Sequence, residues 1–215
     1  MHLFKTPLSF IFAGSSGSGK TQLVTNIIGR LSEVFDRPPK QITICYARQQ
    51  SLYNEIKNSS PIPVTLIEGL PDDLRLLPRT LLIIDDLQEH SAIISHYFTK
   101  NVHHYDLILI YITQNLFLNT PGHRTASLNA SCLVIFKNPR DFSQITHLSR
   151  QIAPNNSKFI VEAYRTATKK PHGYLILNLR QDTPDHLRIR DSFFPKEANF
   201  YVDKKDYKKF DLSHL

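Results

Sequence analysis

The sequence predicts an α/β domain with a mostly parallel central sheet flanked by helices and a β-hairpin near its C-terminal end. Short aliphatic runs of strand length alternate with stretches whose apolar residues recur at helical spacing, which is the pattern of parallel sheets. The runs at 81–84 and 107–112 are aliphatic throughout, as expected for strands buried on both faces. The last two runs, 173–179 and 187–190, are joined by a turn at 181–185, too short for a crossover helix.

The elements follow one another along the whole chain without a clear domain linker, a repeat or a low-complexity tract. We expect one domain over residues 1–195 and a charged C-terminal tail over 196–215. The predicted strands cover residues 8–13, 41–47, 64–67, 81–84, 107–113, 132–136, 173–179 and 187–190. The predicted helices cover residues 20–31, 50–57, 88–98, 124–129, 142–151 and 158–166.

Composition and length argue for an intracellular protein without a membrane partner. The 215 residues are 41% hydrophobic and 21% charged, which is ordinary for a globular protein, and the apolar runs are too short to span a bilayer. The N-terminus lacks the features of a signal peptide. Cys45 and Cys132 each lie in an apolar run, so we expect both to be buried and reduced.

The net charge of +7 is concentrated in one part of the chain. Residues 1–123 contain ten basic and ten acidic side chains, and residues 191–215 contain five of each, so the excess lies in 124–190. A localised basic excess favours a polyanion as partner, although a solvated face without a partner is the alternative. The candidate DNA-facing residues are Lys137, Arg150, Lys169, Lys170, Arg180, Arg188 and Arg190.

The strongest motif is a complete G-x-x-x-x-G-K-[ST] phosphate loop between the first predicted strand and the first predicted helix. Its glycines allow backbone N–H groups to converge on phosphate oxygens, and the following helix adds its positive end. Lys20 is expected to reach the β- and γ-phosphates, and the Thr21 hydroxyl to bind Mg²⁺. The predicted ATP-binding residues are Gly14, Ser15, Ser16, Gly17, Ser18, Gly19, Lys20 and Thr21. This motif and its context predict a P-loop NTPase fold.

Two carboxylates end the aliphatic run at 81–84 and resemble a Walker B strand. Carboxylates at the end of a buried strand are costly unless a cation compensates them. We assign Asp85 to the Mg²⁺ contact, directly or through water, and Asp86 to polarising the attacking water. A pair of helix-capping acids is the structural alternative. Asp86 departs from the commoner Asp-Glu pairing, and because Asp is one methylene shorter than Glu, the attacking water must lie closer to the backbone.

Further polar residues follow the next two strands. Gln114 ends the run at 107–113, where it would face the γ-phosphate, because ligands bind beyond the carboxyl ends of parallel strands. Arg124 and Arg140 are both candidates for an arginine finger supplied to a neighbouring subunit. The alternatives are a polar turn for the glutamine and surface salt bridges for the arginines.

These segments together resemble the genome-packaging ATPases of Polinton/Maverick elements, adintoviruses and related DNA viruses, which are poxvirus-type members of the FtsK–HerA superfamily. The resemblance runs from about Leu8 to Pro195. It implies a ring oligomer that drives double-stranded DNA into a capsid, in the host nucleus or cytoplasm or with the virion. The segments that carry it are 14–21, 81–86, Tyr111-Ile-Thr-Gln-Asn115, 124–130, Phe136-Lys-Asn-Pro-Arg-Asp141, 173–178 and 187–190.

Three other functions remain open at this stage. A small-molecule kinase would need an acceptor pocket and an arginine-rich lid, and no such lid is evident in the sequence. A nucleotide-gated scaffold would bind ATP but barely cleave it. A helicase or partition ATPase would use the same phosphate loop on another nucleic-acid substrate.

Overall fold

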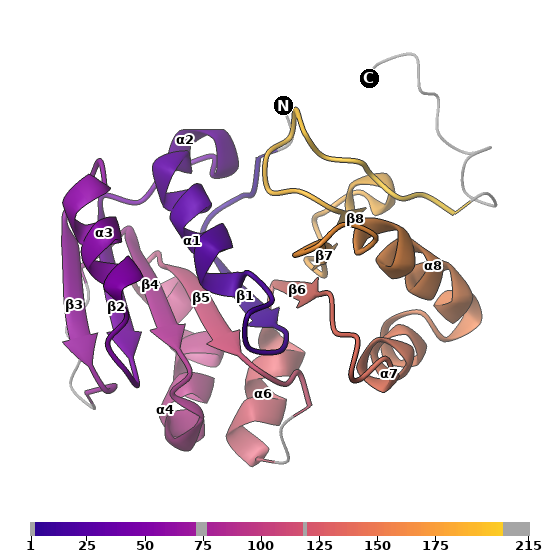
Figure 1. The fold of residues 1–215 in the computed structure, drawn as a ribbon, viewed down its shortest axis with the longest axis horizontal. Helices are drawn as coiled ribbons and strands as arrows, with labels where there is room; N and C mark the ends of the chain where they lie inside the picture. Colours follow the sequence, from indigo (N-terminus) through magenta and orange to yellow (C-terminus); the bar gives the residue numbers. More distant parts are fainter. Residues whose placement is uncertain (1–2, 72–76, 118–119, 204–215) are drawn as a thin grey trace.

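The computed structural model describes residues 3–71, 77–117 and 120–203 of the chain. It contains an eight-stranded sheet with the strand order β3-β2-β4-β5-β1-β6-β7-β8 (Figure 1). The strands are β1 (Leu8–Ala13), β2 (Gln41–Tyr46), β3 (Val64–Glu68), β4 (Thr80–Asp85), β5 (Ile108–Thr113), β6 (Cys132–Phe136), β7 (Tyr174–Asn178) and β8 (Ile189–Arg190).

The pairing of these strands confirms the predicted fold class. All pairs among β1 to β6 are parallel, whereas β7 runs antiparallel to β6 and β8 antiparallel to β7. The predicted C-terminal hairpin is therefore present as β7 and β8. Since β4, β5 and β1 are neighbours in the sheet, the residues that follow these three strands emerge side by side at one edge.

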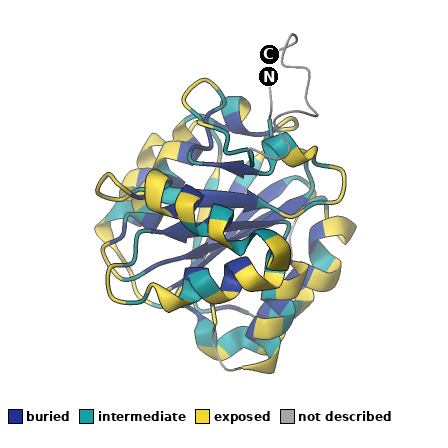
Figure 2. Ribbon diagram, turned by 90° about the vertical axis from the view of Figure 1, so that its right-hand side faces the viewer, coloured by how far each residue is buried: buried dark blue, intermediate teal, exposed yellow. Residues whose placement is uncertain are grey.

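Helices cover both faces of the sheet. One buried apolar cluster lies under α1, α2 and α3, and a second lies under α4 to α8, so the domain has three layers. Figure 2 shows the sheet as the buried interior and the outer helix surfaces as exposed. The helices are α1 (Lys20–Gly29), α2 (Leu31–Val34), α3 (Ser51–Ser59), α4 (Ser91–His96), α5 (Val102–His104), α6 (Pro121–Asn129), α7 (Ser143–Ile152) and α8 (Ser157–Ala167).

Two helix predictions are wrong in extent. The helix predicted over 20–31 ends at Gly29, because Arg30 leaves helical geometry with φ −138°, and the short α2 follows. The helix predicted over 88–98 is divided into a 3₁₀ turn, α4 and a π-helical turn over Tyr97–Asn101. Both apolar patterns were continuous in sequence, which is why periodicity alone did not reveal the breaks.

The described part of the predicted tail packs on the domain. Phe200 bridges to Arg190, and the backbone N–H of Tyr201 donates to the carbonyl of Ile189 at 2.9 Å. The side chain of Asn156 donates to Asp203 at 2.6 Å. Residues 199–201 therefore lie along β8, whereas Glu197 forms an ion pair with Arg30 at 2.8 Å. The rest of the predicted tail, 204–215, lies outside the described residues.

The close crossing of α4 and α6 generates a stability prediction. A Cβ at Gly122 would lie 2.2 Å from the carbonyl oxygen of Ser91, so Gly122→Ala must push the two helices apart. We expect a loss of about 1–3 kcal/mol in the free energy of unfolding, measured by urea denaturation.

Gly29→Ala is the matched control, because a Cβ at Gly29 meets nothing within 4 Å. This substitution should leave the protein equally stable or more stable by about 0.4–1 kcal/mol. Equal stabilities for the two variants would contradict the tight crossing.

Candidate functional site

The sequence-predicted nucleotide residues converge at the carboxyl edge of the sheet. The phosphate loop follows β1, Asp85 and Asp86 lie at the end of β4, and Gln114 follows β5, which lies between them. A cavity of about 330 Å³ opens at this place. Its lining residues are Ser16, Gly17, Gly19, Lys20, Thr21, Gln22, Gln50, Asp85, Asp86, Ile112, Thr113 and Gln114.

The glycines of the phosphate loop are required by its geometry. Gly17 and Gly19 have φ values of 74° and 99°, in the left-handed region that side chains disfavour. A Cβ at Gly14 would lie 2.6 Å from the Cβ of Phe136 on the neighbouring strand β6. The loop can therefore turn tightly against the sheet only with glycine at these positions.

Lys20 lies inside this turn with only 9% of its surface exposed. Its ammonium group donates to the carbonyl oxygens of Gly14 at 2.6 Å and Ser15 at 3.0 Å. Burial lowers the pKa of Lys20, while the charges of Asp85 and Asp86 act in the opposite direction. A buried cation held only by backbone carbonyls is well placed to exchange them for phosphate oxygens.

Asp85 is the second buried charge of the site, with 5% of its surface exposed. The pKa of its carboxyl group is raised, mainly by burial and also by the neighbouring charge of Asp86. The hydrogen bond from Tyr53 and the charge of Lys20 lower the pKa and offset part of this shift. The Tyr53 hydroxyl donates to Oδ2 of Asp85 at 2.5 Å. Tyr53 comes from α3, and sequence reasoning missed it because it belongs to no motif.

Asp86 and Gln114 face each other across β4 and β5. The Gln114 amide donates to the two carboxylate oxygens of Asp86 at 3.3 and 3.4 Å, and Gln88 donates to Oδ1 at 3.1 Å. Asp86 itself has φ 56°, a left-handed conformation. Unlike Asp85 it is exposed, so its carboxylate is accessible to a water in the cavity.

The donors at this edge fit Mg²⁺ bound together with a nucleotide. No group of three or more His, Cys, Asp or Glu side chains in the described ranges could hold a metal alone. Mg²⁺ is typically held by one or two carboxylates plus phosphate oxygens and waters, and Thr21 and Asp85 offer this partial set. The Ser18 hydroxyl is buried and has no hydrogen-bond partner among the described residues, but Ser18 does not line this cavity.

A second cavity of about 480 Å³ adjoins the first beyond the start of α1. The two share Gly19 and Gln22. Its walls combine aromatic rings with polar groups, and His172 lies directly against Gly19, where a Cβ would be 3.1 Å from the histidine Cβ. The remaining lining residues are Leu23, Asn26, Phe136, Tyr174, Ser192, Phe194 and Glu197.

Arg124 and Arg140 are both exposed, and neither lines the phosphate cavity of its own chain. Arg124 lies on α6, where it lines another open groove with Phe117 and Leu128. Arg140 lies in the loop between β6 and α7. Within one chain, the structure therefore does not bring either arginine to the predicted ATP position.

The predicted DNA-facing residues divide into two groups. Arg180 and Arg188 form ion pairs with Asp182 and Asp185 at 2.9 and 2.8 Å, and Arg190 is buried with its guanidinium over the Phe4 ring. These three arginines hold the hairpin region together.

The second group is available to a partner. Lys169 and Lys170 are exposed in the loop before β7, and Lys137 reaches this loop by donating to the carbonyl of Lys169 at 3.3 Å. The same loop contains His172, which touches the phosphate loop. Arg150 is exposed on α7. The three lysines therefore form a basic cluster close to the nucleotide edge.

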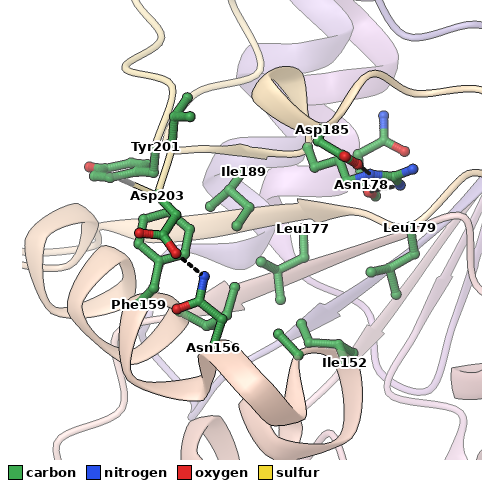
Figure 3. Close-up of a pocket in the computed structure, with 14 residues that line it drawn as sticks. Ile152, Asn156, Phe159, Leu177, Asn178, Leu179, Asp185, Ile189, Tyr201 and Asp203 are labelled. Atoms are coloured by element: carbon green, nitrogen blue, oxygen red, sulfur yellow. Dashed lines mark hydrogen bonds and ion pairs between the residues drawn. The ribbon is translucent and has the colours of Figure 1, made fainter. Parts of the chain in front are cut away.

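A mostly apolar cavity of about 190 Å³ lies between α7, α8 and the hairpin (Figure 3). Ile152, Phe159 and Leu177 contribute apolar walls, and Tyr201 and Asp203 line one side. None of the residues of the phosphate cavity lines it. Its composition offers no phosphate-binding group comparable to the loop at Gly14.

No protein-family model and no curated protein matches this sequence. The fold, however, has a solved counterpart. The genome packaging NTPase B204 of Sulfolobus turreted icosahedral virus 2, solved in complex with ATP-gammaS, aligns with a TM-score of 0.51 at 15% identity. The alignment covers 91% of this chain and 98% of that chain. The predicted P-loop NTPase fold is therefore confirmed.

A protein from Pyrococcus horikoshii OT3 is also similar, at 10% identity and a TM-score of 0.40, over 66% of this chain and 91% of that chain. This likeness is too weak to add to the argument. The described residues also contain no helix with the length and apolar character needed to cross a bilayer.

The burial of Asp85 predicts how stability depends on pH. Because burial raises its pKa in the folded protein, the ionised carboxylate opposes folding near neutral pH, and this cost disappears as the pH falls through the folded-state pKa. Without nucleotide and metal, Asp85→Asn should therefore be more stable than the wild type at about pH 7. The difference should shrink toward about pH 4.5, as measured by urea unfolding.

Asp86→Asn is the control, because this neighbouring carboxylate is exposed. It should change stability little at either pH. A lower stability of Asp85→Asn at neutral pH would mean that attraction to Lys20 outweighs the desolvation of the carboxylate.

Proposed function

We propose that this protein is an ATP hydrolase that translocates double-stranded DNA and packages viral or transposon genomes into capsids. The nucleotide part rests on one observation above the others. Lys20 is buried inside a glycine-rich turn, within the electrostatic reach of Asp85 and Asp86, and beside a cavity of about 330 Å³. A desolvated lysine and carboxylate at one strand edge favour a ligand that combines phosphate with a divalent cation.

The roles of the side chains follow from their positions. Lys20 exchanges the carbonyls of Gly14 and Ser15 for the β- and γ-phosphates of ATP, while the backbone amides of residues 14–21 cradle the phosphate oxygens. Thr21 and Asp85 hold Mg²⁺. When bound, Mg²⁺ neutralises charge on the β- and γ-phosphate oxygens.

The Asp86–Gln114 pair supplies the water-activating and sensing groups. The Asp86 carboxylate is exposed to the cavity, where it would accept a hydrogen bond from the attacking water. It would take the proton of that water as the new bond to the γ-phosphorus forms and the bond to the bridging oxygen breaks, with ADP as the leaving group. Its hydrogen bonds from Gln114 are long, at 3.3 and 3.4 Å, so the amide can turn to the γ-phosphate at little cost. After hydrolysis, the Gln114 amide donates to Asp86 again. This change of partner couples the loss of the phosphate to the ends of β4 and β5.

The adjoining cavity accommodates the base and ribose. It begins at Gly19, where the phosphate chain would leave the loop, and the half-buried Tyr174 ring is the wall available for stacking a purine. Phe136 and Phe194 are buried beneath it, and Arg30 covers the Phe194 ring at 3.6 Å. Asn26 and Glu197 offer polar groups for the base edge or the ribose hydroxyls.

Double-stranded DNA is supported as the partner by the position of the basic cluster. Lys137, Lys169 and Lys170 belong to a part of the chain that has eleven basic and four acidic residues. Their loop touches the phosphate loop through His172 and Gly19, so movement at the nucleotide can reach a DNA contact over a short path. The resemblance to packaging ATPases and the likeness to a viral packaging NTPase support the same assignment.

The main test is the rate of ATP hydrolysis with and without double-stranded DNA. Added DNA should raise the rate of the wild type. Lys20→Ala should lower the rate by on the order of 100-fold or more in both conditions, because the phosphates lose their buried cation. DNA affinity should fall steeply with salt, as expected when lysines release counterions from phosphates.

Lys57→Ala is the matched control, since Lys57 is an exposed lysine on α3 that lines neither cavity. It should hydrolyse ATP at the wild-type rate. ATP turnover that is indifferent to DNA, together with DNA binding that has no salt dependence, would exclude the translocase. ATP binding without turnover would instead favour a nucleotide-gated scaffold.

We further propose a homo-oligomeric ring in which Arg124 or Arg140 completes the site of the neighbouring subunit. Subunits with Arg124→Ala, or with Arg140→Ala, should each be mixed with separate subunits that carry Lys20→Ala. In such a mixed ring, one subunit supplies an intact phosphate loop and its neighbour supplies the intact arginine. For the arginine that acts in trans, about a quarter of the sites in an equal mixture recover both parts. Activity should then exceed that of either variant alone.

The unmixed variants are the controls for this experiment. If neither mixture recovers activity while both arginine variants are inactive alone, neither Arg124 nor Arg140 acts between subunits.

A further inference from the structure

We propose that Tyr53 is a positioning residue for the metal site, acting through Asp85. Its hydroxyl occupies one carboxylate oxygen and thereby turns the other toward the metal and its waters. This inference rests on the proposed function, because it assigns Tyr53 a role only if Asp85 serves a metal–nucleotide complex.

The hydrogen bond that carries the proposal is short and buried. The Tyr53 hydroxyl donates to Oδ2 of Asp85 at 2.5 Å, and the two residues have exposed fractions of 1% and 5%. A hydrogen bond to a charged acceptor in a buried place is stronger than one between neutral groups. It also restricts the rotation of the carboxylate.

The phenol ring is itself held in place by a second aromatic residue. Tyr53 stacks on Tyr46 with ring centroids 5.0 Å apart and an interplanar angle of 27°. Tyr46 is the last residue of β2 and pairs in register with Asp85 on β4. The next residue, Ala47, donates its N–H to the Asp85 carbonyl at 3.2 Å. The backbone of Asp85 and the ring that supports its side-chain partner are thus fixed by the same strand.

This arrangement extends the metal site to α3. Gln50, at the N-terminal cap of α3, lines the phosphate cavity, and Tyr53 lies one turn further along. The helix therefore contacts the nucleotide edge at two points, through an amide at the cavity and a phenol behind the carboxylate. Groups that orient a metal ligand from behind typically change metal affinity by about 10- to 100-fold when removed.

The test uses Tyr53→Phe, which removes the hydroxyl and keeps the stacked ring. Mn²⁺ serves as the probe, and its binding to the complex with a non-hydrolysable ATP analogue is measured by electron paramagnetic resonance. We expect the dissociation constant of Mn²⁺ to rise about 10-fold. Binding of the analogue in EDTA should not change, because Tyr53 does not line the phosphate cavity.

Tyr46→Phe is the matched control, since it removes a hydroxyl from the other ring of the stack and leaves the Asp85 hydrogen bond in place. Its Mn²⁺ affinity should equal that of the wild type. In an Asp85→Asn background, Tyr53→Phe should cause no further loss, as required if the phenol acts only through Asp85. If Tyr53→Phe alone lowers the unfolding temperature, the comparison in the Asp85→Asn background still decides, because a general loss of stability would weaken Mn²⁺ binding there as well.

The outcomes separate this inference from the proposed function. Equal Mn²⁺ affinities of the wild type and Tyr53→Phe would overturn the role of Tyr53 and leave the ATPase proposal intact. An additional loss in the Asp85→Asn background would likewise overturn it. A wild-type protein that binds neither the analogue nor Mn²⁺ would overturn the proposed function itself.

Discussion

The central constraint of this domain is the burial of two opposite charges at one edge of the sheet. Lys20 and Asp85 are 9% and 5% exposed. Lys20 is the first residue of α1, after the loop that follows β1, and Asp85 ends β4, which β5 separates from β1. Burial disfavours the charged form of both side chains, so neither charge stabilises the folded protein without a ligand. Backbone carbonyls hold the lysine and a tyrosine holds the carboxylate. The surrounding structure therefore maintains a costly arrangement that a phosphate–metal complex would relieve.

Backbone conformation accounts for the unusual Asp86. With φ 56°, this residue lies in the left-handed region, which Asp and Asn adopt more readily than other residues with a side chain. The chain turns there because the N–H of Asp86 bonds the Ile112 carbonyl of β5 at 3.2 Å. Glu, the commoner residue at this position, tolerates that conformation less well. The departure from the Asp-Glu pairing is thus consistent with the local geometry, and the Gln114 amide faces the shorter carboxylate.

Much of this edge could be predicted from sequence because each part is local. The glycine loop is contiguous, and aliphatic runs mark β4 and β5, so the ends of these strands place Asp85, Asp86 and Gln114 together once the sheet is parallel. Tyr53 and Gln50 could not be found in this way. They reach the site only because β2 lies next to β4 in the sheet, and local sequence patterns do not determine the order of strands. The burial of Arg190, a DNA-facing candidate in sequence, has the same origin, since Phe4 becomes its neighbour only in the folded domain.

The packing of α4 against α6 links the segments that follow Asp86 and Gln114. Asp86 leads into α4 and Gln114 leads into α6. Gly122 brings the helices so close that a single methyl group would collide with Ser91. The buried His123 ring bonds the Leu116 carbonyl at 2.8 Å, which ties the segment after Gln114 to α6. Close-packed helices shift together rather than deform. A change in the Asp86–Gln114 contact must therefore be shared by both helices, and α6 carries Arg124 on its exposed side.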